Sequence, residues 1–136
     1  MMNRVFELKN NLCELDRLKA EVNKLGKAIN ASEKVIYELN LALEEVISNI
    51  IFYGYEDNEE HQISIEFSHK NKTLFITISD DGRPFNPLET SEPNLGCPFE
   101  ERDIGGLGIF LVRNVIDELY YKCENNSNIL IMKKKL

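Results

Sequence analysis

The sequence predicts an α+β fold, a two-layer α/β sandwich with helices packed on one face of a mixed, mostly antiparallel sheet. Two observations support this fold class. Apolar residues recur at helical spacing in the first third of the chain, whereas later segments are predicted to pair locally as strand hairpins. The elements come in the order helices, hairpin, long loop, helix, hairpin, which lacks the strict strand–helix alternation of a doubly wound fold. The 136 residues fit a single domain, 1–136.

The N-terminal part of the chain, residues 1–32, predicts a short strand at 3–8 and then an amphipathic helix. Apolar residues three or four positions apart mark this helix: Leu12, Leu15, Leu18, Val22, Leu25 and Ile29. Ser32 is a suitable N-cap for a second helix, because its hydroxyl can accept a hydrogen bond from an unpaired backbone N–H. We expect this helix over residues 33–52, ending at Gly54.

The following segments change to the period of strands. Residues 63–68 and 74–78 alternate apolar and polar side chains on either side of a polar turn, which predicts an antiparallel hairpin with one buried face. A helix at about 109–117 and a second hairpin within 118–133 complete the chain. The turn of the second hairpin is expected at 125–127, where two asparagines and a serine adjoin.

Between the two hairpins, residues 83–104 show no hydrophobic period. This segment contains four prolines: Pro84, Pro87, Pro93 and Pro98. A stretch of this length without regular structure is usually a functional loop or a lid in a compact domain. We therefore expect a lid here.

Composition excludes several classes of function. The formal net charge of −7 argues against a nucleic-acid-binding surface, which needs clustered Lys and Arg. The longest apolar stretches are too short to span a membrane, and the first residues carry no secretory signal pattern. The three cysteines are widely spaced and form no zinc-binding pattern with the two histidines. We expect a cytoplasmic protein with reduced thiols.

The first chemical motif lies on the second predicted helix. Glu45 and Asn49 are four residues apart, so both side chains emerge from the same helix face. Asn49 offers a neutral oxygen to a hard cation such as Mg²⁺. Glu45 can orient or deprotonate a nucleophile close to that metal. On its own the pair is more typical of a solvated helix face. We interpret Tyr53 and Tyr55 at the helix end as packing residues.

The second motif ends the first hairpin. Asp80, Asp81 and Gly82 follow an apolar run, a pattern typical of a tight turn because Gly tolerates unusual backbone angles and Asp bonds its own backbone. The functional interpretation is that Asp80, at the buried end of the strand, accepts a hydrogen bond from an exocyclic amine such as that of adenine.

The third motif is a glycine-rich turn directly before a predicted helix. Its residues are Gly105, Gly106, Leu107 and Gly108. Backbone N–H groups of such a turn, together with the helix dipole, favour an anion. The turn matches neither the dinucleotide-binding nor the P-loop pattern. By itself it is also compatible with a flexible linker.

Together and in this order, the three motifs resemble the N-box, G1 box and G2 box of the histidine-kinase-like (GHKL) ATPase superfamily, which has the Bergerat fold. Glu45 to Asn49 matches the N-box, Asp80 to Gly82 the start of the G1 box, and Gly106 to Gly108 the G2 box. The strings LEEVISNIIFYGY, ISDDGRPFNP and EERDIGGLGIFLVRNVIDELYY are similar to the small anti-sigma-factor serine/threonine kinases of this superfamily. The resemblance covers about residues 33–135.

This resemblance implies a site for ATP and Mg²⁺. Asp80 and Gly82 would bind adenine, Asn49 the Mg²⁺ that bridges the phosphates, and Glu45 would be the catalytic carboxylate. The triphosphate would be bound beneath the lid 83–104 by the following residues: Gly105, Gly106, Leu107 and Gly108. Arg102, near the end of the lid, is assigned to the γ-phosphate. Pro84 departs from the family pattern, because many members have a second G1 glycine there.

The resemblance also implies partners. A protein of this type sequesters a sigma factor or similar regulator in one state and phosphorylates a serine of a small antagonist protein in another. Relatives of this type often form homodimers. An alternative from a different class is an ATP-dependent interaction module without significant phosphotransfer. The catalytic half of a two-component histidine kinase fits less well, because His61 and His69 lie in or beside a hairpin and not on a dimerisation helix.

Overall fold

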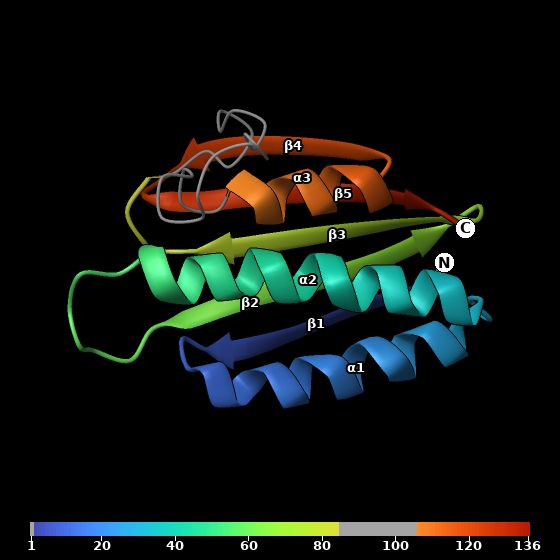
Figure 1. Ribbon diagram of the computed structural model, residues 1–136, viewed down its shortest axis with the longest axis horizontal. Coiled ribbons are helices and arrows are strands. Elements are labelled where there is room, and N and C mark those ends of the chain that lie inside the picture. Colours follow the sequence, from blue (N-terminus) through green and yellow to red (C-terminus); the bar gives the residue numbers. More distant parts are fainter. Residues whose placement is uncertain (1, 85–105) are drawn as a thin grey trace.

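The computed structural model describes residues 2–84 and 106–136, and its helices cover one face of a five-stranded sheet (Figure 1). The predicted α+β class is confirmed. In chain order the elements are β1 (Met2–Lys9), a short 3-10 helix (Leu12–Glu14), α1 (Leu15–Ala28), α2 (Glu33–Tyr53), β2 (Gln62–Lys70), β3 (Thr73–Asp80), α3 (Gly106–Val115), β4 (Glu118–Glu124) and β5 (Ser127–Lys135).

The strand order across the sheet is β1-β2-β3-β5-β4. Every neighbouring pair of these described strands is antiparallel, so the sheet is more regular than the mixed sheet that we expected. β3 lies in the middle of the sheet and pairs with β2 on one side and β5 on the other. In the second pairing Asp80 stands opposite Asn128, which brings together two polar residues that lie far apart in the sequence.

The core lies between the sheet and the three helices, and α2 packs against both α1 and α3. Alternation along β2 and β3 places Ile63, Ile65 and Phe67 on the same inward face as Leu74, Ile76 and Ile78, all essentially inaccessible to solvent. The amphipathic pattern of α1 buries Leu18, Val22 and Leu25 against this face. No helix in the described ranges is long and apolar enough to cross a membrane.

The predicted cap and turns are confirmed. The Ser32 hydroxyl accepts a hydrogen bond from the Val35 N–H at 3.2 Å, which satisfies one free donor at the start of α2. Asn125 and Asn126 both have positive φ, 53° and 62°, as a two-residue hairpin turn with the correct twist requires. Asn71 and Lys72 make the equivalent turn in the first hairpin, with φ of 51° and 60°.

A buried lysine fixes the last turn of α3. Lys134 faces inward from β5 and is 7% exposed. Its ammonium donates to the Val115 carbonyl at the C-terminus of α3 and lies 3.3 Å from the carboxylate of Glu38 on α2. A cation at this end complements the helix dipole. The Lys134 ammonium thus joins α2, α3 and β5 at the end of α3 remote from the glycine motif.

Candidate functional site

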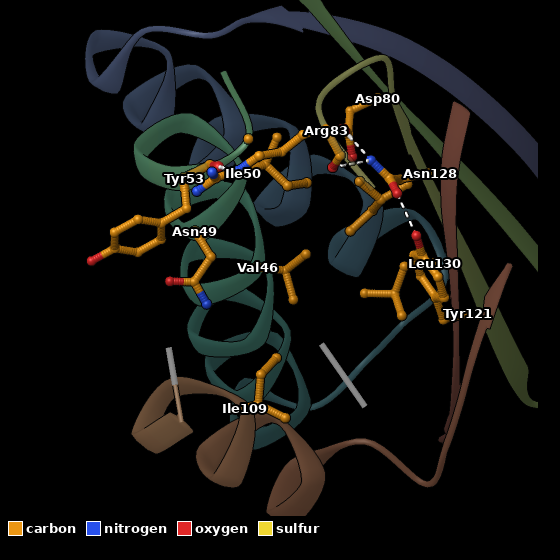
Figure 2. Close-up of a pocket in the computed structure, with 12 residues that line it drawn as sticks. Val46, Asn49, Ile50, Tyr53, Asp80, Arg83, Ile109, Tyr121, Asn128 and Leu130 are labelled. Carbon is orange, nitrogen blue, oxygen red and sulfur yellow. Dashed lines mark hydrogen bonds between the residues drawn. The ribbon is translucent and has the colours of Figure 1, made fainter. Parts of the chain in front are cut away.

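A pocket opens where α2 ends, between that helix, the adjoining ends of β3 and β5, and the first turns of α3 (Figure 2). Its empty volume is about 530 Å³, counting the open mouth. The walls are largely apolar, and a few polar side chains lie among them, as is common in small-molecule sites. The lining residues are Val46, Asn49, Ile50, Tyr53, Gly54, Ile78, Asp80, Arg83, Ile109, Tyr121, Asn128 and Leu130.

Asp80 is the acidic group of this pocket. It ends β3 and is only 8% exposed. Its Oδ1 accepts hydrogen bonds from the Gly82 N–H at 2.9 Å and from the Asn128 amide at 3.1 Å. Burial raises the pKa of Asp80, and these two hydrogen bonds oppose that rise because they favour the carboxylate. Both bonds reach Oδ1, and none of the described residues donates to Oδ2, which can therefore accept from a donor that enters the pocket.

Asn128 holds the turn that follows Asp80. Besides the Asp80 bond, its amide nitrogen donates to the carbonyls of Gly82 at 3.2 Å and Arg83 at 3.0 Å. The Tyr121 hydroxyl donates in turn to the Asn128 side-chain oxygen (Figure 2). Sequence reasoning missed Asn128 and Tyr121. One signal was present, since Asn128 occupies an inward-facing position of β5 where an apolar residue is expected.

The same turn is fastened to the end of α2. The Arg83 N–H donates to the Gly54 carbonyl at 2.8 Å, and the Arg83 guanidinium donates to the Tyr53 carbonyl at 2.7 Å. A Cβ atom on Gly82 would lie 2.6 Å from the Gly54 carbonyl oxygen, so only glycine permits this approach. The predicted tight turn after β3 is confirmed. The predicted loop beginning at residue 83 therefore starts with Arg83, which belongs to this turn, and Pro84 is the last described residue before 85–105.

Asn49 lines the pocket from α2, as its position in the sequence suggested. Its amide nitrogen is buried and has no hydrogen-bond partner among the described residues. Such an unsatisfied polar group costs free energy, which a ligand can recover by bonding to it. Glu45 lies one helical turn earlier and is half-buried, but it does not line the pocket. The structure therefore brings together Asn49 and Asp80 and leaves Glu45 outside the lining.

Gly106, Leu107 and Gly108 lie in the first turn of α3, which begins three residues earlier than predicted. The expectation that they form a turn before the helix is therefore wrong, because their backbone is already helical. The N-terminus of α3 lies at the same end of the molecule as the C-terminus of α2 (Figure 1), and Ile109 reaches the pocket. Free N–H groups of a helix N-terminus favour an anion. Gly105, Arg102 and the rest of 85–104 lie outside the described residues.

The arrangement suits a ligand with an apolar, amine-bearing part and an anionic part. Val46, Ile50 and Leu130 offer apolar contact to a ring, and Asp80 offers a buried acceptor to its amine. Asn49 and the N-terminus of α3 supply polar groups for an anion or its metal ion.

Comparison with known proteins agrees with this geometry. A family model described as a histidine kinase-like ATPase domain matches residues 8–134. The chain is 33% identical over 98 residues to the serine-protein kinase RsbW of Listeria innocua, an alignment that covers 66% of this chain and 61% of that protein. It is 30% identical over 123 residues to the RsbW of Oceanobacillus iheyensis, covering 87% of this chain and 73% of that protein.

Two further similarities extend this result. The anti-sigma F factor of Clostridium novyi is 33% identical over 109 residues, with 74% of this chain and 71% of that protein covered. Among solved structures, the RsbU and RsbW domains of Rv1364c from Mycobacterium tuberculosis superpose with a TM-score of 0.70 at 11% identity, over 100% of this chain and 33% of that chain. At this identity the superposition demonstrates a shared fold.

Proposed function

The chain belongs to the histidine kinase-like ATPase family, and we propose that it is an ATP-binding anti-sigma factor with protein serine kinase activity. It would sequester a sigma factor or similar regulator in one state and phosphorylate a serine of a small antagonist protein in another. The observation that carries the nucleotide part is the buried carboxylate of Asp80, which Asn128 holds in an otherwise largely apolar pocket.

Adenine binding follows from the two oxygens of Asp80. Oδ1 is occupied by the turn and by Asn128, whereas Oδ2 can accept from the exocyclic amine of adenine. The apolar walls shield this bond from water, which strengthens it. Gly82 allows the turn to remain close to the end of α2 while the ring is bound.

The triphosphate would lie between Asn49 and the N-terminus of α3. The buried amide nitrogen of Asn49 has no hydrogen-bond partner among the described residues, which supports an acceptor such as a phosphate oxygen at this position. Asn49 would contribute its oxygen to Mg²⁺, and Gly106 to Gly108 would contribute backbone N–H groups to the phosphates. Mg²⁺ would neutralise charge that develops on the transferred phosphoryl group. We assign Gly105 and Arg102 to the same phosphates, Arg102 to the γ-phosphate, on the family resemblance alone.

Glu45 is proposed as the group that orients the incoming serine hydroxyl. It lies on α2 one turn from Asn49, outside the pocket lining, so it would face the protein substrate rather than the nucleotide. None of the described residues forms an ion pair with its carboxylate. A carboxylate in this position can accept the hydroxyl proton as the phosphoryl group arrives.

The partners are proposed from the relatives, which are named serine-protein kinases and an anti-sigma factor. We propose a sigma factor or comparable regulator, an antagonist protein that carries the acceptor serine, and a homodimer of this chain. This function implies a cytoplasmic location. The alignment to the Listeria kinase spans 61% of that protein, so the activity rests on the site in this chain and not on the name.

One observation favours a second candidate function. Because Glu45 does not line the pocket, the nucleotide could bind without phosphotransfer and serve only to set the affinity for a partner. This is the ATP-dependent interaction module.

The two functions are separated by one experiment. The purified chain is titrated with ATP in a calorimeter with and without Mg²⁺, and then incubated with γ-labelled ATP and a candidate antagonist from the same genome. We expect Mg²⁺-dependent binding and label on a serine of the antagonist. Binding without transfer to any candidate would favour the interaction module, and no binding at all would refute both.

A further inference from the structure

A histidine lies on the outer side of the proposed adenine-binding turn. His61 precedes β2, and its ring stacks on Tyr55, with centroids 4.2 Å apart and planes 16° from parallel. Its side chain is only 16% exposed. The backbone N–H of His61 donates to the Asn10 side chain at 2.8 Å. The position of the ring is thus fixed by packing and by a backbone bond.

Both ring nitrogens face carboxylates from different segments. Nε2 lies 2.8 and 3.0 Å from the two oxygens of Asp57, and Nδ1 lies 3.2 Å from Oδ2 of Asp81. A carboxylate accepts hydrogen bonds, so both contacts are satisfied at once only when both nitrogens carry protons. The geometry therefore requires the imidazolium form. The hydrogen bonds to Asp57 and then Asp81 raise the pKa of His61, and the pKa of Asp57 is lowered in return.

Two other titratable groups surround the ring. One oxygen of Glu59 lies within 4.8 Å of a His61 nitrogen and adds negative charge that favours the imidazolium. The phenol of Tyr55 remains neutral over the whole physiological range, because burial first and then the charges of Asp80 and Asp81 raise its pKa. The ionised groups that face the ring are therefore carboxylates. Lys9, which lines the same hollow as Tyr55 and Asp57, is paired with Glu60 at 3.5 Å, and His61 is the group whose charge changes near neutral pH.

The cluster is connected directly to the proposed nucleotide site. Asp81 follows Asp80, and its negative charge contributes to the raised pKa of the Asp80 carboxyl. A cation on His61 offsets that repulsion and ties the turn to the segment that contains Asp57. Loss of the proton leaves Nδ1 and Nε2 with one hydrogen for two carboxylates, so one of the two contacts must break.

We propose that His61 is a positioning residue: its imidazolium holds the turn Asp80–Arg83 in the geometry that binds nucleotide, so nucleotide affinity falls as pH rises through the titration of His61. This inference rests on the proposed function. The direction of this pH effect follows from the raised pKa of His61. The stabilising proton is present at pH 6 and is lost as pH rises above 6.5, the ordinary pKa of histidine.

The test measures ATP affinity by calorimetry from pH 6 to pH 9 with excess Mg²⁺. Four proteins are compared: wild type, His61→Gln, Asp57→Asn and His69→Gln, the last being the other histidine, at the far end of β2. We expect the ATP affinity of the wild type to fall about fivefold between pH 6 and pH 9. This is at the low end of the coupling usual between two linked sites, because Asp81 is 59% exposed. His69→Gln should behave as the wild type, and His61→Gln should retain only the pH dependence of the nucleotide itself.

Asp57→Asn identifies the titrating group. Removal of this carboxylate lowers the pKa of His61, so the midpoint of the affinity change should move to lower pH while Asp81 keeps its contact. Equal pH profiles in wild type and His61→Gln, or an unmoved midpoint in Asp57→Asn, would overturn the inference.

A nucleotide-free measurement separates this inference from the proposed function. NMR should show the His61 ring titrating above pH 6.5 in the wild type, and amide exchange at residues 81–83 should quicken, beyond the intrinsic rise with pH, as the ring loses its proton. Added ATP should raise the His61 pKa further, by reciprocity of linkage. If amide exchange at residues 81–83 does not change with the ionisation of His61, the positioning role is refuted even if ATP binds. Absence of ATP binding at every pH refutes the proposed function alone.

Discussion

At the scale of single residues, the pocket contains a carboxylate whose burial opposes its own ionisation. Asp80 is kept in place by Asn128 and by the Gly82 N–H, and both bonds favour the charged form that burial disfavours. Binding sites commonly contain groups that are costly to bury in the free protein and are satisfied by a ligand. The exocyclic amine of adenine is a suitable partner for the remaining oxygen.

Replacement of this acid tests adenine binding. Asp80→Asn keeps the shape and can keep the Asn128 contact through its oxygen, but it lacks the second acceptor that a carboxylate has. We expect ATP affinity to fall about tenfold or more in a calorimetric titration. Asp16→Asn, an exposed change on α1, is the matched control. Unchanged affinity in Asp80→Asn would remove Asp80 from the site.

The division of roles on α2 is also testable at this scale. Glu45→Gln should leave Mg-ATP binding nearly intact while phosphotransfer falls by on the order of a hundredfold or more. Asn49→Ala should instead weaken the Mg²⁺-dependent part of binding. Glu44→Gln, which alters the exposed neighbouring carboxylate, controls for charge.

Calorimetry and a transfer assay on the same preparations distinguish these outcomes. If Glu45→Gln and Asn49→Ala lost ATP binding equally, with no separate loss of rate, the assigned roles would be wrong and the interaction module would be preferred.

At the scale of elements, the end of α2 and the turn after β3 act as one unit. Arg83 donates to the carbonyls of Tyr53 and Gly54, and its guanidinium also pairs with Glu56 at 3.0 Å. Asp81 adds the contact to His61 in the segment that follows α2. Movement of this segment would therefore be transmitted to Asp80.

A single methyl group tests this coupling. Gly82→Ala places a Cβ 2.6 Å from the Gly54 carbonyl oxygen, and backbone cannot retreat as a flexible side chain can. We expect a loss of about 1–3 kcal/mol in the free energy of unfolding. We also expect the folded protein to bind ATP more weakly, because the displaced turn contains the adenine contact.

Gly26→Ala is the comparison for this variant. Its Cβ would lie 2.5 Å from Ile36 Cγ1, at the contact of α1 with α2. It should destabilise the fold without changing the ATP affinity of the folded protein. Chemical denaturation and calorimetry measure the two quantities, and equal effects of Gly26→Ala and Gly82→Ala on affinity would mean that the turn is not specifically coupled to the site.

At the scale of the whole molecule, the proposed site is assembled from both halves of the sequence around the central strand β3. α2 supplies Asn49, β5 supplies Asn128, and α3 supplies its N-terminus. The segment 85–104, most of the predicted lid, connects β3 to α3 and lies outside the described residues. Its role remains a prediction from sequence.

That prediction concerns hydrogen exchange. A loop between the two nucleotide motifs can be ordered by contact with the phosphates, so ATP and ADP should affect it differently. Arg83 is already fixed in the turn after β3, so we expect residues 85–104 of the predicted lid to be protected by Mg-ATP and to exchange faster without nucleotide. Arg102→Ala should reduce the difference between ATP and ADP more than it weakens ADP binding. The same protection of 85–104 in the free, ADP and ATP forms would mean that this segment is a fixed loop.

The sequence by itself predicted the elements and the three motifs on which the family resemblance rests. Apolar periodicity specified α1, α2 and the first hairpin, because amphipathic spacing is a local property of the chain that its neighbours along the sequence reveal. Asn49 and Asp80, which its motifs singled out, both line the pocket. The sequence misjudged the start of α3, because glycines usually interrupt helices but are tolerated in a first turn whose N–H groups remain free.

Only the tertiary structure decided how Asp80 is held. The pairing of β3 with β5 sets Asn128 opposite Asp80 across 48 residues of sequence, and Tyr121 reaches that amide from the next strand. His61 lies 20 residues from Asp81 and meets it only because the segment after α2 folds back on the turn. Strand register and loop packing depend on burial of the whole core, which no local pattern encodes, so these contacts were beyond the reach of the sequence alone.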